Sequence, residues 1–75
     1  MKRRVLLVED DPQHRQVVAL ILAREGYEVI EAETVRQAIG ALDEAPAPAA
    51  IVLDLLLPGT TGWEFLDWLN KRGTL

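Results

Sequence analysis

The sequence predicts an α/β domain built on an open parallel sheet, and three observations lead to this fold class. Short apolar runs rich in strand-forming residues alternate with longer segments whose apolar residues recur at helical spacing. The runs at 5–8 and 50–53 are apolar throughout, which is typical of parallel strands covered on both faces. The strand–helix order repeats with short connections, and right-handed crossovers then place helices on both faces of the sheet.

The first strand and helix are predicted from the N-terminal third of the chain. The apolar run at 5–8 stops at three consecutive acids. Asp11 and Pro12 predict a helix start, because aspartate caps helices well and proline loses no hydrogen bond at the first helical position. Apolar residues at 17, 18, 21 and 22, widened by Leu20, give this helix one apolar stripe. Gly26 ends the helix, since glycine can take a positive φ.

The second strand, at 27–32, is predicted to lie at an edge of the sheet, because Glu28 and Glu31 suit a strand with one side in water. Thr34 and Gln37 form a capping box that begins the second helix, with Thr34 as N-cap. The buried stripe of that helix comprises the apolar residues at 38, 39, 41 and 42. With the second strand at the edge, the first and third strands become neighbours, and the predicted strand order is 2-1-3.

The third strand and helix complete the pattern. The apolar run at 50–53 ends on Asp54, and residues 55–59 are expected to form a turn. Thr61 and Glu64 make a second capping box, with Thr61 as N-cap, and the helix that follows is expected to end at Gly73. Its apolar positions include the two tryptophans, Trp63 and Trp68, which we expect to pack in the core or against a partner. No repeat or linker divides the chain.

Composition excludes several classes of function. The 75 residues include no cysteine, which excludes disulfides, thiolate metal sites and a thiol nucleophile, and the one histidine excludes a multi-histidine metal site. Twelve acids against eight bases give a net charge of −4, which argues against nucleic-acid binding. No apolar stretch is long enough to span a bilayer. We therefore expect a cytoplasmic domain that binds neither membrane nor nucleic acid directly.

Acidic residues follow the two strands that are predicted to be neighbours. In open α/β sheets, sites form beyond the carboxyl ends of the strands, where Glu9, Asp10 and Asp11 follow the first strand and Asp54 follows the third. Carboxylates gathered at one edge repel each other unless a cation or a proton compensates. Mg²⁺ suits such an incomplete set of oxygen ligands, and a carboxylate beside the metal can act as a nucleophile toward a phosphoryl group.

Structural roles compete with this interpretation. Asp11 is expected to be the N-cap of the first helix, and Glu9 and Asp10 would complement the dipole at a helix start. Asp54 is harder to explain structurally, because an acid within an apolar stretch is costly unless it is paired, metal-bound or at an exposed strand end. The sequence lacks the glycine-rich dinucleotide and P-loop motifs and contains no serine. His14 is expected to be a solvated helix residue without a catalytic partner.

Together these residues resemble the receiver domain of bacterial two-component response regulators. The first strand leads into Glu9-Asp10-Asp11-Pro12, and the third leads into Asp54-Leu55-Leu56-Leu57-Pro58-Gly59-Thr60-Thr61-Gly62, which matches the pattern D-x-x-[LM]-P-x-x-x-G. This pair of motifs, at the separation found in the family, is specific. The resemblance covers essentially all 75 residues and implies a flavodoxin-like (βα)5 topology, of which residues 1–75 would be a partial domain of three units.

The resemblance implies a role for each matching residue. Asp54 would accept a phosphoryl group from a sensor histidine kinase. Asp10 and Asp54 would bind Mg²⁺ together with the backbone carbonyl of Leu56, and Glu9 would act through a metal-bound water. The residues that would shape the loop after the phosphorylation site are Pro58 and Gly62. The domain would be a regulatory acceptor and not an enzyme, apart from self-phosphorylation from small donors and self-dephosphorylation.

The chain also departs from the family. A receiver has five strand–helix units, so the hydroxyl residue after its fourth strand and the lysine after its fifth are not among these 75 residues. The strand at 50–53 would leave a bare apolar edge, which favours association. Two functions therefore stay open. The domain is either a phosphoacceptor or a half-receiver that is not phosphorylated and serves as an interaction or oligomerisation module through this edge or the third helix.

Overall fold

A computed structural model gives the fold of the chain and describes residues 3–44, 47–53 and 62–72. Three strands alternate with three helices: β1 (Arg4–Val8), α1 (Pro12–Arg24), β2 (Glu28–Ala32), α2 (Val35–Glu44), β3 (Ala50–Leu53) and α3 (Gly62–Arg72). The predicted alternation of strands and helices is confirmed, with most element ends within one or two residues of those expected. The predicted turn at 55–59, the N-cap Thr61 and the helix end at Gly73 lie outside the described residues.

The strands form one parallel sheet in the order β2-β1-β3, as predicted. β1 pairs with β2 from Arg4 opposite Glu28 to Val8 opposite Ala32. The charged pair at the start of this register also contacts through its side chains, with Arg4 Nε 3.6 Å from Glu28 Oε2. Because β2 is an edge strand, its acids can contact water and the cations of neighbouring elements. This is why Glu28 and Glu31 predict an edge strand from the sequence.

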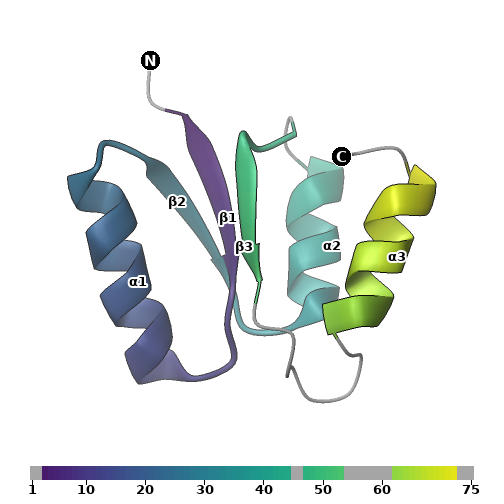
Figure 1. The fold of residues 1–75 in the computed structure, drawn as a ribbon, viewed down its shortest axis with the longest axis horizontal. Coiled ribbons are helices and arrows are strands. Elements are labelled where there is room, and N and C mark those ends of the chain that lie inside the picture. The colour runs from purple at the N-terminus through teal and green to yellow at the C-terminus, as the bar shows by residue number, and fades with distance from the viewer. Residues whose placement is uncertain (1–2, 45–46, 54–61, 73–75) are drawn as a thin grey trace.

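Helices cover the two faces of the sheet unequally (Figure 1). Of the described helices, α1 alone lies on one face, while α2 and α3 lie side by side on the other. The main core forms between the sheet and this pair of helices, where Phe65 and Leu69 of α3 are fully buried. The other buried members of this core are Leu6, Val8, Ala32, Val35, Ala38 and Leu42. Trp68 borders it and stacks on Phe65 with ring centroids 5.9 Å apart, in agreement with the predicted packing role.

α1 is less buried than its apolar stripe predicts. The helix contains no buried residue, and Val17, Leu20 and Ile21 are each more than half exposed. Only the part of the stripe at Val18 and Leu22 is half-buried. The sequence pattern correctly identifies an apolar helix face. Within the described part of the chain, however, the neighbouring elements bury only the portion of this face that lies against the sheet.

The ends of the first two helices are fixed by local hydrogen bonds. At Gly26, which has a φ of 92°, the backbone N–H donates to Ala23 O at 3.0 Å, and the next N–H, of Tyr27, donates to Leu22 O at 3.1 Å. These two bonds form a Schellman motif, which ends α1 and turns the chain into β2. At the start of α2, Thr34 Oγ1 accepts from Gln37 N at 3.1 Å. Oε1 of the Gln37 side chain in turn accepts a hydrogen bond at 2.7 Å from the backbone N–H of Glu33, one residue before the N-cap.

Within the described part of the chain, no helix is both long enough and apolar enough to cross a membrane.

Candidate functional site

The candidate site lies where β1 and β3 end, at the lower edge of the sheet in Figure 1. Val8 and Leu53 are register partners and are the last residues of their strands. Glu9 therefore follows one partner in the sequence and Asp54 follows the other. The backbone N–H of Glu9 continues the ladder to β2, donating to Ala32 O at 3.0 Å. Of the predicted site residues, Asp54, Leu56 and Pro58 lie outside the described residues, and Gly62 is the first residue of α3.

Glu9 is a buried acid whose two carboxylate oxygens are both hydrogen-bonded. The residue is only 6% exposed. Its Oε1 accepts from the backbone N–H of Asp11 at 3.2 Å, and its Oε2 lies 2.8 Å from Nδ1 of His14. A buried carboxylate is costly without such partners, so these two bonds account for its burial and hold it in one orientation.

The contact of His14 with Glu9 is one that the sequence analysis missed, since we expected a solvated helix residue without a catalytic partner. Asp11 caps α1, with Oδ1 accepting from the N–H groups of Gln13 at 3.0 Å and His14 at 3.4 Å. His14 is therefore the third residue of the helix, the position from which a side chain can reach back across the helix start. The sequence does contain a feature that could have predicted this contact, namely a polar residue three positions after an N-cap aspartate. The side chain is 62% exposed, so the expectation of solvation is correct for most of the ring.

Arg15 is a second residue that supports the site from α1, and its side chain is 13% exposed. Its Nη1 donates to the backbone carbonyl of Glu9 at 3.1 Å. Its Nε lies 3.3 Å from Glu31 Oε1, and its Nη2 lies 3.3 Å from Glu33 Oε1. One guanidinium thus ties the end of β1 to the end of β2, which fixes the backbone that carries the acids.

Asp10 differs from Glu9 in being exposed. Its side chain makes no hydrogen bond or ion pair with any residue of 3–44, 47–53 or 62–72. The oxygen donors of Glu9 and Asp10 are of the kind that Mg²⁺ prefers, and Mg²⁺ needs only one or two carboxylates. The chemistry of this pair therefore fits the metal. No group of three or more histidine, cysteine or acidic residues able to hold a metal occurs among the described residues.

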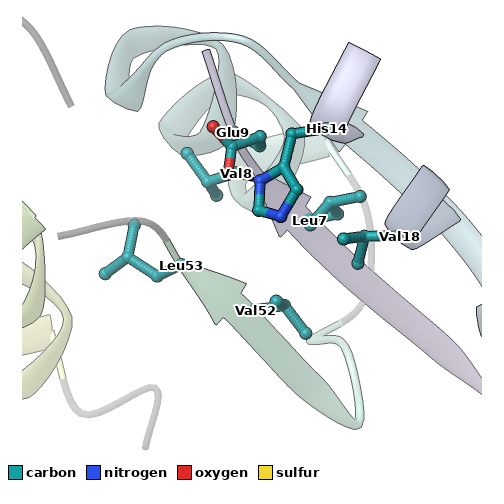
Figure 2. A pocket seen from close by; sticks show the side chains of 7 residues that line it. All are labelled: Leu7, Val8, Glu9, His14, Val18, Val52 and Leu53. Carbon is teal, nitrogen blue, oxygen red and sulfur yellow. Dashed lines mark hydrogen bonds and ion pairs between the residues drawn. The ribbon is translucent and has the colours of Figure 1, made fainter. Parts of the chain in front are cut away.

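A hollow beside Glu9 opens on the α1 face of the sheet (Figure 2). It has a volume of about 220 Å³ and is lined at one end by Glu9 and His14. Leu7 and Val18 form another part of its wall, and Val52 of β3 lies across from them. The His14 ring lies beside the Glu9 carboxylate, and these two are the polar members of a lining that is otherwise made of leucine and valine side chains.

An open parallel sheet with carboxylates beyond the ends of adjacent strands defines a class of α/β domains that place their site at the strand ends. Comparison with known families then identifies the chain, because the model of the response regulator receiver domain matches residues 5–75. The chain belongs to this family, as the sequence motifs predict.

Relatives of known function agree with this assignment. The chain is 39% identical over 72 residues to the phosphate regulon transcriptional regulatory protein PhoB of Klebsiella pneumoniae, an alignment that covers 96% of this chain and 31% of that protein. It is also 39% identical over 69 residues to the transcriptional regulatory protein TcrA of Mycobacterium tuberculosis, covering 92% of this chain and 27% of that protein. The chain thus spans less than a third of the length of these curated relatives.

Solved structures support the fold. The chemotaxis response regulator CheY4 of Vibrio cholerae matches with a TM-score of 0.90 and 31% identity, covering 99% of this chain and 61% of that one. The receiver domain of a LuxO repressor protein from Vibrio parahaemolyticus matches with a TM-score of 0.88 and 35% identity, covering 99% and 56%. A chain in the crystal structure of the histidine kinase ThkA in complex with the response regulator TrrA matches with a TM-score of 0.86 and 32% identity, covering 96% and 60%.

Proposed function

We propose that this domain is a phosphoacceptor in two-component signalling, with Asp54 as the residue that accepts the phosphoryl group from a sensor histidine kinase. A carboxylate oxygen of Asp54 would form the new bond to phosphorus while the bond between phosphorus and the kinase histidine breaks. The product would be an acyl phosphate. The domain would act as a regulatory acceptor, with its own chemistry limited to self-phosphorylation from small donors and self-dephosphorylation.

The pairing of Val8 with Leu53 is the observation that carries this proposal. Neighbouring parallel strands end at the same edge of a sheet, so the residues that follow two register partners start from adjacent positions. Glu9 follows Val8, and Asp54 follows Leu53. A site that combines the acids after β1 with the acceptor after β3 requires these two strands to end side by side. The register of β1 with β3 meets this requirement.

Mg²⁺ is the cofactor that we propose for the site. When bound, the metal screens the approach of an anionic phosphoryl group to a carboxylate. Asp10 and Asp54 would be its carboxylate ligands, with the carbonyl of Leu56 as a further ligand and Glu9 acting through a metal-bound water. The exposed, unbonded carboxylate of Asp10 supports its role as a direct ligand, because no bond within the described residues has to be broken first. Pro58 and Gly62 would shape the loop that follows.

The proposed partner is a sensor histidine kinase, in keeping with the kinase complex among the similar structures. The phosphoryl transfer is tested by incubating the chain with acetyl phosphate and Mg²⁺ and measuring its intact mass. We expect one adduct, about 80 Da heavier, on Asp54 that hydroxylamine removes and that Asp54→Asn lacks. An adduct on Thr60 or Thr61, or an equal adduct in Asp54→Asn, would contradict the proposal.

We also propose that the isolated chain associates with a second copy of itself through β3 or α3. Within the described residues β3 pairs only with β1, so one edge of this apolar strand has no strand partner. Val52 on this strand is 38% exposed. An exposed apolar edge is a template for further strand pairing, and this supports self-association in addition to the phosphoacceptor role.

A further inference from the structure

The hydrogen bond between His14 and Glu9 is the feature of the site that the phosphoacceptor proposal does not use. A carboxylate can only accept hydrogen bonds, so at the 2.8 Å contact the Nδ1 atom of His14 carries the hydrogen and donates it to Glu9 Oε2. The tautomer of the ring is thus set by this bond.

The two bonds to the Glu9 carboxylate are of different kinds. The bond to Oε1 comes from the backbone N–H of Asp11, so it is present with any side chain at that position. The bond to Oε2 depends on the side chain at position 14 alone. Without it, the buried carboxylate would keep one partner and could rotate about its side-chain bonds away from the end of β1.

The bond from His14 leaves Glu9 able to act at a metal site. The two oxygens of a carboxylate offer about four acceptor positions, and the two bonds described occupy two of them. The remaining acceptor positions of the Glu9 carboxylate can accept a hydrogen bond from a metal-bound water. Partners that orient such a carboxylate commonly change metal affinity by about tenfold or more when removed.

We propose that His14 is a positioning residue that holds the Glu9 carboxylate in the orientation that binds the water shell of Mg²⁺. This inference rests on the proposed function and deepens it, because it concerns the same metal site. His14 acts through Glu9 and touches neither the metal nor the phosphoryl group. The metal affinity of the domain thereby depends on a residue in the first turn of α1.

The test compares the chain with two variants at position 14. His14→Leu removes the donor, while His14→Asn restores one, because its amide nitrogen lies as many bonds from Cα as Nδ1 does. Gln13→Leu is the matched control, since Gln13 is exposed in the same turn and, within residues 3–44, 47–53 and 62–72, only its backbone is hydrogen-bonded. MgCl₂ titrations followed through the backbone amide resonances of Glu9 and Asp10 give the affinity. Long-range ¹H–¹⁵N correlation of the ring gives the tautomer of His14 without metal.

We expect the Nδ1–H tautomer in the metal-free chain, on the order of tenfold weaker Mg²⁺ binding in His14→Leu, and affinity within about twofold of the original in His14→Asn and Gln13→Leu. His14 is mostly exposed, so circular dichroism should show the same fold in all four proteins. Equal affinity in His14→Leu and the original chain, or no rescue by asparagine, would overturn the inference and leave the phosphoacceptor proposal standing. A chain that neither responds to Mg²⁺ nor is labelled on Asp54 would overturn both.

Discussion

Arg15 of α1 donates a hydrogen bond to the backbone carbonyl of Glu9 at 3.1 Å, and the same guanidinium contacts Glu31 near the end of β2 and Glu33 just beyond it. A planar group with several donors can bridge three acceptors at once, which a lysine ammonium does with less geometric precision. The helix start, the end of β1 and the end of β2 are therefore held together by one side chain. The site acids sit on a backbone that this bridge keeps in place.

Replacing Arg15 with methionine should lower the free energy of unfolding by about 1–3 kcal/mol, because the carbonyl of Glu9 loses a charged donor while the apolar stem is kept. Glu31 and Glu33 are about half exposed, so their ion pairs should contribute little of this. Urea unfolding followed by circular dichroism measures the change. Arg24→Met, at the exposed end of the same helix, is the control and should change stability by less than about 1 kcal/mol. A similar loss in both variants would show that Arg15 does not act as a bridge.

The arrangement of strands could be predicted from a few residues of the sequence. Glu28 and Glu31 identify β2 as an edge strand, because an edge is where charges on a strand can meet water or a cation, as Glu28 meets Arg4. The continuous apolar run at 5–8 predicts a central strand, and β1 does have neighbours on both sides. Asp11 and Gly26 predict the limits of α1, because capping and positive φ are local requirements that the sequence states directly.

The burial of α1 could not be predicted in the same way. The stripe at Val17, Ile21 and their neighbours shows that the helix has an apolar face, but a pattern does not state how much of that face is covered. Coverage depends on which elements lie beside the helix, and no other helix of the described part of the chain lies on the same face of the sheet as α1 (Figure 1). The exposure of Val17 and Leu20 is therefore a property of the packing and not of the helix itself.

The candidate site was predicted in part. The acids could be located at the end of β1 because sites in such sheets form at strand ends. The contacts of Glu9 with His14 and Arg15 could not be predicted, because each depends on the rotamers of side chains that meet across the start of a helix. The metal and phosphoacceptor roles of Asp10 and Asp54 stay predictions, which the following experiment addresses for the metal.

Mg²⁺ should raise the melting temperature of the chain, because the metal binds the folded state and relieves repulsion between its carboxylates. At a concentration about tenfold above its dissociation constant, the increase should be on the order of 5–10 °C for a domain of this size. Asp10→Asn should abolish the increase and keep the fold, since Asp10 is exposed. Glu25→Gln, an exposed acid at the other end of α1, is the control and should keep the full increase. An equal response in Asp10→Asn and the original chain would remove Asp10 from the metal site.

Val52 provides the test of self-association through β3. It lies opposite Leu7 in the register, yet Leu7 is 2% exposed and Val52 is 38% exposed, so the α1 face of the sheet is open on its β3 side. Val52→Lys puts a charge at this exposed position of β3, the strand with an unpaired edge among the described residues. The substitution should shift the chain toward monomer at micromolar concentration, since charge on an edge strand opposes pairing. The cost in stability should be small, because a lysine can extend its charged end from this exposed position into water.

Sedimentation velocity over a wide concentration range measures the association. Gln16→Lys, which adds the same charge at an exposed position of α1, should leave the association of the chain unchanged. A folded monomer of the original chain throughout this range would show that three strand–helix units are stable with the edge of β3 open, and it would contradict the proposed association.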